Sequence, residues 1–123
     1  MKNITTYINE SKSTPIKMTV REFFYFYCGG LDEDTFDSVD LGYNLFGEDG
    51  TAKDVVKYLN KYKDTKVSVA YQHVSGADGG YDEIVVTGLP ENAGNRFDTV
   101  AGSDSEFKQS AKAAIKELKK GGA

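Results

Sequence analysis

TVREFFYFYCGG, residues 19–30, is the stretch of this 123-residue sequence on which the fold depends most. Its five consecutive aromatic residues would suit a β-strand. Thr19 and Glu22, however, have the spacing of a capping box, in which each side chain accepts a hydrogen bond from the other residue's backbone amide at a helix start. The two glycines at its end favour a left-handed helix stop. One helical face is formed by Val20, Phe23, Phe24 and Tyr27. We therefore expect a helix over residues 20–28, with a strand as the alternative.

Three further helices are indicated by periodicity and capping. Residues 3–11 place apolar side chains on one face, but a helix this short is marginal alone, so it must dock or fray. Thr51 caps a helix that extends to Tyr62 with lysines on its outer face. Ser103 and Glu106 form a second capping box, which opens the most strongly amphipathic helix of the chain. The apolar face of that helix comprises Phe107, Ala111, Ala114, Ile115 and Leu118.

Three strands are predicted between these helices. Residues 39–45 alternate apolar and polar side chains, which is typical of a strand with one buried face. Residues 66–74 and 81–88 are rich in β-formers, and the Gly-rich loop at residues 75–80 joins them as a hairpin. Residues 89–102 contain proline and glycine without a firm period, so we expect a loop there.

These elements give the order α-α-β-α-β-β-α and an α+β fold class. The β-α-β portion predicts a parallel pair joined by a right-handed crossover, to which the hairpin adds an antiparallel strand. We therefore expect a small three-stranded mixed sheet with three to four helices packed on it. A chain of 123 residues is long enough for one core and too short for two ordinary domains. The prediction is a single domain over residues 1–123, with residues 1–14 as a loosely docked N-terminal helix.

Composition and the N-terminal segment indicate a soluble cytoplasmic protein. Hydrophobic residues make up 39% and charged residues 28%, as in ordinary folded domains. The first residues lack the apolar run of a signal peptide, and nowhere do 18 apolar residues occur together, so no membrane association is expected. Cys28 is the only cysteine, which rules out an internal disulfide and favours a small core residue.

Neither a catalytic site nor a metal site is indicated by the residue pattern. A nucleophilic site would have to pair Cys28 with His73, the only histidine, and no local signature joins them. A structural zinc site needs four such ligands, which this chain does not have. Counted from Asp32, the sixth and twelfth positions of a calcium loop are Asp37 and Tyr43 rather than Gly and Glu. We therefore expect no catalytic residues, no metal and no cofactor, with weak irregular divalent binding as an alternative.

Nucleic-acid and phosphate binding are also disfavoured. Lysines recur every four residues along the last helix: Lys108, Lys112, Lys116 and Lys120. They lie opposite its apolar face, where a solvated surface is expected, and the formal net charge of the chain is −4. The glycine-rich residues 76–80 join two strands and do not open a helix, unlike phosphate-binding loops.

The charge distribution points to a partner-binding surface. Between Gly29 and Gly50 there is no Lys or Arg, while seven acids occur: Asp32, Glu33, Asp34, Asp37, Asp40, Glu48 and Asp49. Tyr25 points away from the apolar face of its predicted helix, so it could anchor a partner or a self-contact. The alternative for Tyr25 is that a neighbouring element, such as the N-terminal helix, covers this side. The predicted binding residues are these seven acids and Tyr25.

Residues 2–11, KNITTYINES, resemble the start of many small proteins of bacteriophages and gut-bacterial mobile elements. The resemblance covers about ten residues and extends to no named family. It implies a protein that acts stoichiometrically on host machinery, including defence nucleases. Some inhibitors of that kind present an acidic surface in the place of DNA, and residues 32–49 would supply it here.

The sequence therefore predicts a non-enzymatic module that binds a host protein through its acidic segment. One alternative is a small ligand-binding domain or enzyme that uses carboxylates the pattern does not single out. Another is an assembly protein that binds copies of itself through the aromatic helix. The oligomeric state stays open.

Overall fold

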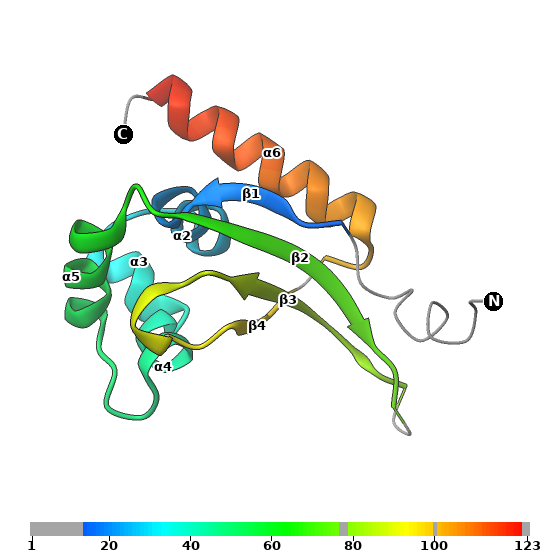
Figure 1. The fold of residues 1–123 in the computed structure, drawn as a ribbon, viewed down its shortest axis with the longest axis horizontal. Coiled ribbons are helices and arrows are strands. Elements are labelled where there is room, and N and C mark those ends of the chain that lie inside the picture. The colour runs from blue at the N-terminus through cyan, green and yellow to red at the C-terminus, as the bar shows by residue number, and fades with distance from the viewer. Residues whose placement is uncertain (1–13, 77–78, 100, 122–123) are drawn as a thin grey trace.

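The computed structural model describes residues 14–76, 79–99 and 101–121 and has an α+β fold (Figure 1). Over those residues it forms a four-stranded antiparallel sheet, five α-helices and one short 3₁₀ helix. In chain order the elements are β1 (Ile16–Thr19), α2 (Val20–Cys28), α3 (Glu33–Ser38), α4 (Leu41–Phe46), α5 (Ala52–Tyr62), β2 (Lys66–Val74), β3 (Tyr81–Thr87), η2 (Pro90–Asn92), β4 (Arg96–Asp98) and α6 (Asp104–Gly121). The predicted helix over residues 3–11 lies outside the described residues.

The helix expected over residues 20–28 is confirmed as α2, and its capping box is complete. The amide of Glu22 donates to Thr19 Oγ1 at 3.0 Å, and the amide of Thr19 donates to Glu22 Oε1 at 2.8 Å. Gly29 ends the helix at φ 85°, a left-handed conformation that favours glycine. The local start and stop signals therefore prevail over the β-propensity of the aromatic run.

The predicted three-stranded mixed sheet is wrong in strand number and direction. The four strands lie in the order β1-β2-β3-β4, and every neighbouring pair is antiparallel. The neighbour of β2 on one side is β1, with Ile16 opposite Val69, so no parallel β-α-β crossover forms. The predicted hairpin is confirmed as β2 and β3.

The strand predicted over residues 39–45 is a helix, α4. Leu41 and Leu45, four residues apart, are both buried, while Tyr43 between them is exposed. The spacing of Leu41 and Leu45 is compatible with two structures, a strand with one buried face or a short helix. In the helix the buried Gly42 packs closely on the chain at Gly50 and Thr51, where a Cβ would lie 2.7 Å from the carbonyl oxygen of Thr51.

Residues 89–102, expected to be a loop, contain two short elements. Pro90–Asn92 forms η2, and Arg96–Asp98 forms the edge strand β4, in which Phe97 lies opposite Ile84. β1 and α3 were likewise not predicted. Each of these elements has three to six residues, which is too few for a periodic pattern to stand out.

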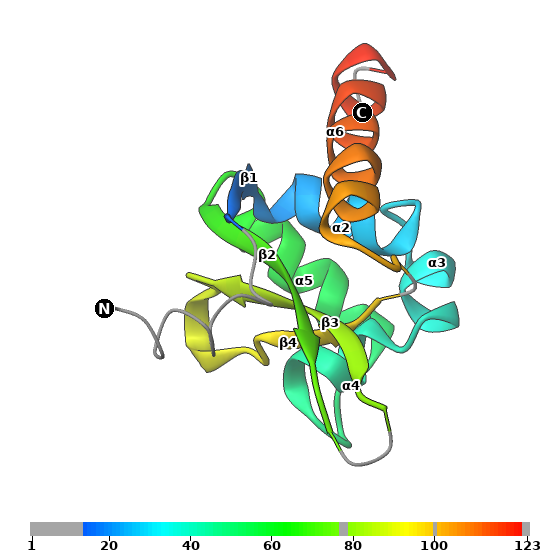
Figure 2. The same ribbon diagram turned by 90° about the vertical axis from the view of Figure 1, so that its right-hand side faces the viewer.

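One face of the sheet carries the core. Residues paired on this face include Met18 with Val67, Val69 with Val86, Tyr71 with Ile84, and Ile84 with Phe97, and all of them are buried. Helix α2 packs against α5 and α6, and α5 also contacts α3 and α4. Figure 2 shows α2, α3 and α6 to one side of the sheet. Two phenylalanines of α2 connect the sheet to the helices. Phe23 contacts Phe97 of β4, and Phe24 contacts Phe36 of α3.

Candidate protein-interaction surface

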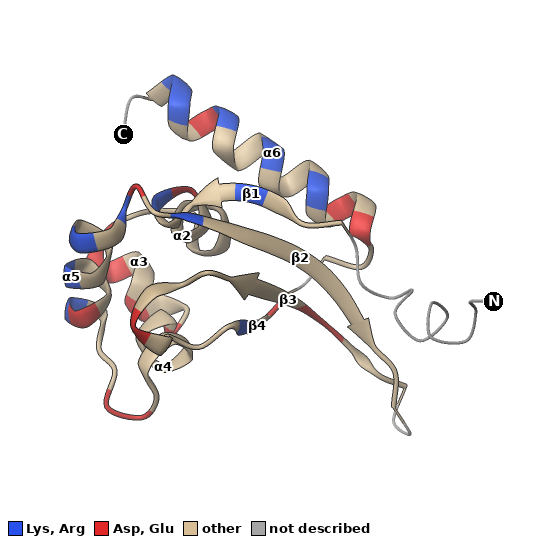
Figure 3. Cartoon of the chain, in the orientation of Figure 1, with Lys and Arg blue, Asp and Glu red and all other residues tan. Residues whose placement is uncertain are grey.

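Seven exposed carboxylates, together called the acidic surface, lie on α3 and on the chain that flanks α3 and α4 (Figure 3). They are Asp32, Glu33, Asp34, Asp37, Asp40, Glu48 and Asp49. None of them has an ion pair with a Lys or Arg of the described residues. Their charge is therefore directed to solvent or to a partner. The lysines of α6, shown in blue in Figure 3, are separated from this surface along the chain.

Two of these acids also shape the backbone. Asp32 is the N-cap of α3 and accepts from the amide and the hydroxyl of Thr35 at 2.8 and 2.6 Å. These hydrogen bonds hold the pKa of Asp32 below its usual value. Asp40 precedes α4 at φ 52°, a left-handed conformation that Asp tolerates better than most residues. Asp32 is thus part of the scaffold as well as of the charged surface.

Two exposed aromatic side chains lie on α4 within the same segment. The exposed fractions are 58% for Tyr43 and 38% for Phe46, which are high for side chains of this size. One edge of the Phe46 ring packs on Tyr58 of α5, with ring centroids 5.4 Å apart. Sequence reasoning missed both, since it placed Tyr43 on the buried face of a strand. Reading residues 41–46 with helical periodicity would have found them.

Close backbone contacts at three glycines hold α4 in place. A Cβ at Gly50 would lie 2.1 Å from the carbonyl oxygen of Gly42, and one at Gly94 would lie 2.1 Å from the oxygen of Asn44. The amide of Gly94 also donates to the carbonyl of Leu45 at 2.9 Å. The aromatic side chains of α4 are therefore displayed on a closely packed backbone, which lowers the entropic cost of binding.

Tyr25, the eighth predicted binding residue, is placed apart from the acids. Its hydroxyl donates to Glu117 Oε1 of α6 at 2.9 Å, and this hydrogen bond raises the pKa of Tyr25. The described element that packs on this side of α2 is α6, and the N-terminal helix suggested by the sequence lies outside the described residues. The structure thus gives Tyr25 a contact within the molecule.

Cys28 and His73 are held in separate environments. Burial raises the pKa of the Cys28 thiol, the opposite of what a nucleophile requires. His73 Nδ1 lies 2.6 Å from Asp82 Oδ1, which also accepts from the Tyr71 hydroxyl at 2.9 Å. The hydrogen bonds from His73 and Tyr71 lower the pKa of Asp82. Over the described ranges, no three His, Cys, Asp or Glu side chains are grouped so that they could hold a metal ion.

Among the helices that the structure describes, none has both the length and the apolar composition of a membrane-spanning segment. Comparisons with protein-family models, with curated proteins and with solved structures found no match to this chain.

Proposed function

We propose that this chain is a non-enzymatic protein-binding module whose partner docks on α3, α4 and the turn that follows α4. The observation that carries the proposal is the exposure of Tyr43 and Phe46 on α4, in a segment with seven carboxylates that form no ion pair with a described Lys or Arg. Exposed aromatic residues on a fixed backbone are the side chains that most often dominate the affinity of protein interfaces.

The two kinds of side chain would contribute differently. The aromatic rings would be buried in the complex and limit its dissociation. The carboxylates would accelerate association with a basic surface and select against acidic partners. A host protein with a basic surface fits this description. A nuclease that binds DNA is one such protein, and the phage-like N-terminal segment, residues 2–11, favours that choice.

The competing proposals have less support from the described residues. Self-association through the aromatic helix α2 would compete with the contact between Tyr25 and Glu117. An enzyme would need an activated nucleophile or a pair of carboxylates with divergent pKa values, and the acids of the acidic surface are exposed.

Replacing Tyr43 with alanine is expected to weaken partner binding at least about tenfold, the loss typical of an interface anchor. The matched control is Tyr81→Ala, because Tyr81 is 53% exposed but lies on the β2–β3 hairpin. Both side chains are exposed, so neither change should alter the free energy of unfolding by more than about 0.5 kcal/mol.

The measurement is a quantitative pull-down from bacterial host lysate at low and moderate salt, followed by titration of the captured protein. A third variant reverses Glu33, Asp34 and Asp37 to lysine and keeps the cap at Asp32. The proposed partner is retained by wild type and Tyr81→Ala and lost from Tyr43→Ala and from the charge-reversed variant. Its binding weakens as salt rises. Equal retention by all four proteins would refute this surface.

A further inference from the structure

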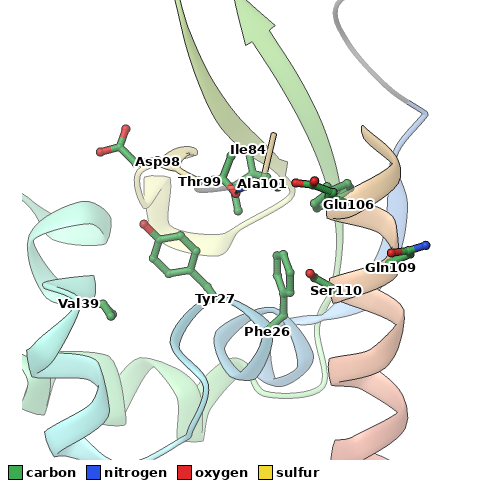
Figure 4. Close-up of a pocket in the computed structure, with 11 residues that line it drawn as sticks. Phe26, Tyr27, Val39, Ile84, Asp98, Thr99, Ala101, Glu106, Gln109 and Ser110 are labelled. Atoms are coloured by element: carbon green, nitrogen blue, oxygen red, sulfur yellow. Dashed lines mark hydrogen bonds between the residues drawn. The ribbon is translucent and has the colours of Figure 1, made fainter. Parts of the chain in front are cut away.

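A cavity of about 650 Å³ opens where α2, α6 and the end of β4 meet (Figure 4). Its apolar part is formed by Phe26, Ile84 and Phe107, and the rings of Phe26 and Phe107 meet edge to face with centroids 5.7 Å apart. Ile84 and Phe107 are fully buried, so the floor of the cavity belongs to the core. The volume lies in the range of small-molecule sites.

The charged side chains that line this cavity are both acidic: Asp98 at the end of β4 and Glu106 in the first turn of α6. Glu106 Oε1 accepts from the Gly102 amide at 2.7 Å. Asp98 is exposed, and its carboxylate has no hydrogen bond or ion pair within the described residues. The lining residues include no Lys or Arg. The cavity therefore combines an apolar floor with uncompensated negative charge.

Tyr27 lines the cavity together with the apolar floor and Asp98. Figure 4 shows its ring directed from α2 towards the side of the cavity where Asp98 lies. Burial raises the pKa of Tyr27, and the nearby charge of Asp98 adds to the effect. The phenol is therefore neutral at physiological pH and places an aromatic ring on the same side of the cavity as a carboxylate, an arrangement that attracts cations.

We propose that this cavity binds an organic cation, an ammonium group attached to a flat apolar body. The body lies on Phe26, above the buried Ile84 and Phe107, and the ammonium group lies between Asp98 and Tyr27. An anionic ligand would be repelled by Asp98 and Glu106, and a neutral one would make no favourable charge interaction with Asp98, whose carboxylate has no partner within the described residues. None of the seven acids, Tyr43 or Phe46 lines the cavity, although Val39, which does, lies between α3 and α4.

The test compares three probes with one phenylethyl body: phenethylamine, 2-phenylethanol and 3-phenylpropionate. Each is titrated into ¹⁵N-labelled full-length protein, and amide chemical shifts are followed. Phenethylamine is expected to shift the amides of Tyr27, Phe107 and Ser110 with a dissociation constant of about 1 mM, which is usual for a ligand of this size. The alcohol should bind about tenfold more weakly, and the carboxylate should not bind.

Asp98→Asn is expected to weaken phenethylamine binding about tenfold and leave 2-phenylethanol unchanged. The matched control is Asp49→Asn, which removes the same charge from an exposed acid outside the cavity. Ser110→Trp, a change at an exposed lining position of α6, should block binding of the amine and the alcohol by filling the cavity. The native amide spectrum of each variant verifies its fold.

Equal affinity for the amine and the alcohol would overturn the proposal, as would unchanged amine binding by Asp98→Asn. Shifts confined to the smaller hollow beside Phe46 and Tyr58, or no shift at 20 mM phenethylamine, would also overturn it. None of these results depends on whether a protein partner is found.

Discussion

Cys28 is expected to react with Ellman's reagent at pH 8 at least about thirty times more slowly in the folded protein than in guanidinium. Burial at the end of α2 raises the pKa of its thiol from 9.0 to about 12. At pH 8 the thiolate fraction then falls from about a tenth to about one in ten thousand. The greater nucleophilicity of a more basic thiolate recovers part of this thousandfold loss.

The measurement is the first-order rate of thionitrobenzoate release under native conditions and in guanidinium, with N-acetylcysteine as the reference thiol. A native rate within tenfold of the unfolded rate would contradict the expectation. It would show that Cys28 is ionised and accessible, and a nucleophilic role for it would have to be considered again. A slow native rate would leave Cys28 as a packing residue.

Replacing Gly50 with alanine is expected to lower the free energy of unfolding by about 3 kcal/mol, the upper part of the range for overpacking. The new methyl carbon would lie 2.1 Å from the carbonyl oxygen of Gly42 and 3.0 Å from Cβ of Phe46. The first distance is far inside van der Waals contact, and the opposing atom belongs to the backbone, so α4 itself must move. Urea denaturation measures the loss.

The control for this substitution is Gly76→Ala in the hairpin loop, where nothing lies within 4 Å of the added carbon. Neither glycine has a positive φ, so both variants add a Cβ without backbone strain. The control should change stability by less than about 0.5 kcal/mol, or raise it slightly through the lower entropy of the unfolded chain. A loss below about 1 kcal/mol for Gly50→Ala would show that α4 is not held by this contact.

The helices with complete local signals could be predicted from the sequence. Thr19 with Glu22 begins α2, and Thr51 with Asp54 begins α5, through pairs of hydrogen bonds that depend only on neighbours along the chain. The hairpin was also predictable, because β2 and β3 have seven or more residues and a glycine-rich connection.

The remaining elements depend on contacts between distant segments. α4 packs closely on Gly50 and on Gly94 in the chain before β4, and the residues within α4 give no indication of these contacts. β1 gains its register from β2, which lies about fifty positions later. A single core residue, Met18, marks β1, and Phe97 alone marks β4. Such short edge strands carry too little information for recognition in one sequence.

The sequence predicted the acidic residues of the candidate site but not its exposed aromatic residues. The seven acids could be counted directly, whereas Tyr43 and Phe46 became visible only when α4 was known to be a helix. Asp98 and Glu106 gave no signal either, because their common cavity joins the end of one strand to the start of a helix.

The sequential sheet has a consequence for how the molecule assembles. β2, β3 and β4 pair with their neighbours along the chain, so they can form with little loss of loop entropy. β1 pairs with β2 only by closing a loop that contains α2 to α5 and the entire acidic surface. We therefore expect this closure to come late in folding. Until β1 pairs with β2, the segment that carries Tyr43 and Phe46 is not held at both ends by the sheet. We therefore expect the chain to become able to bind its partner only in the last folding step.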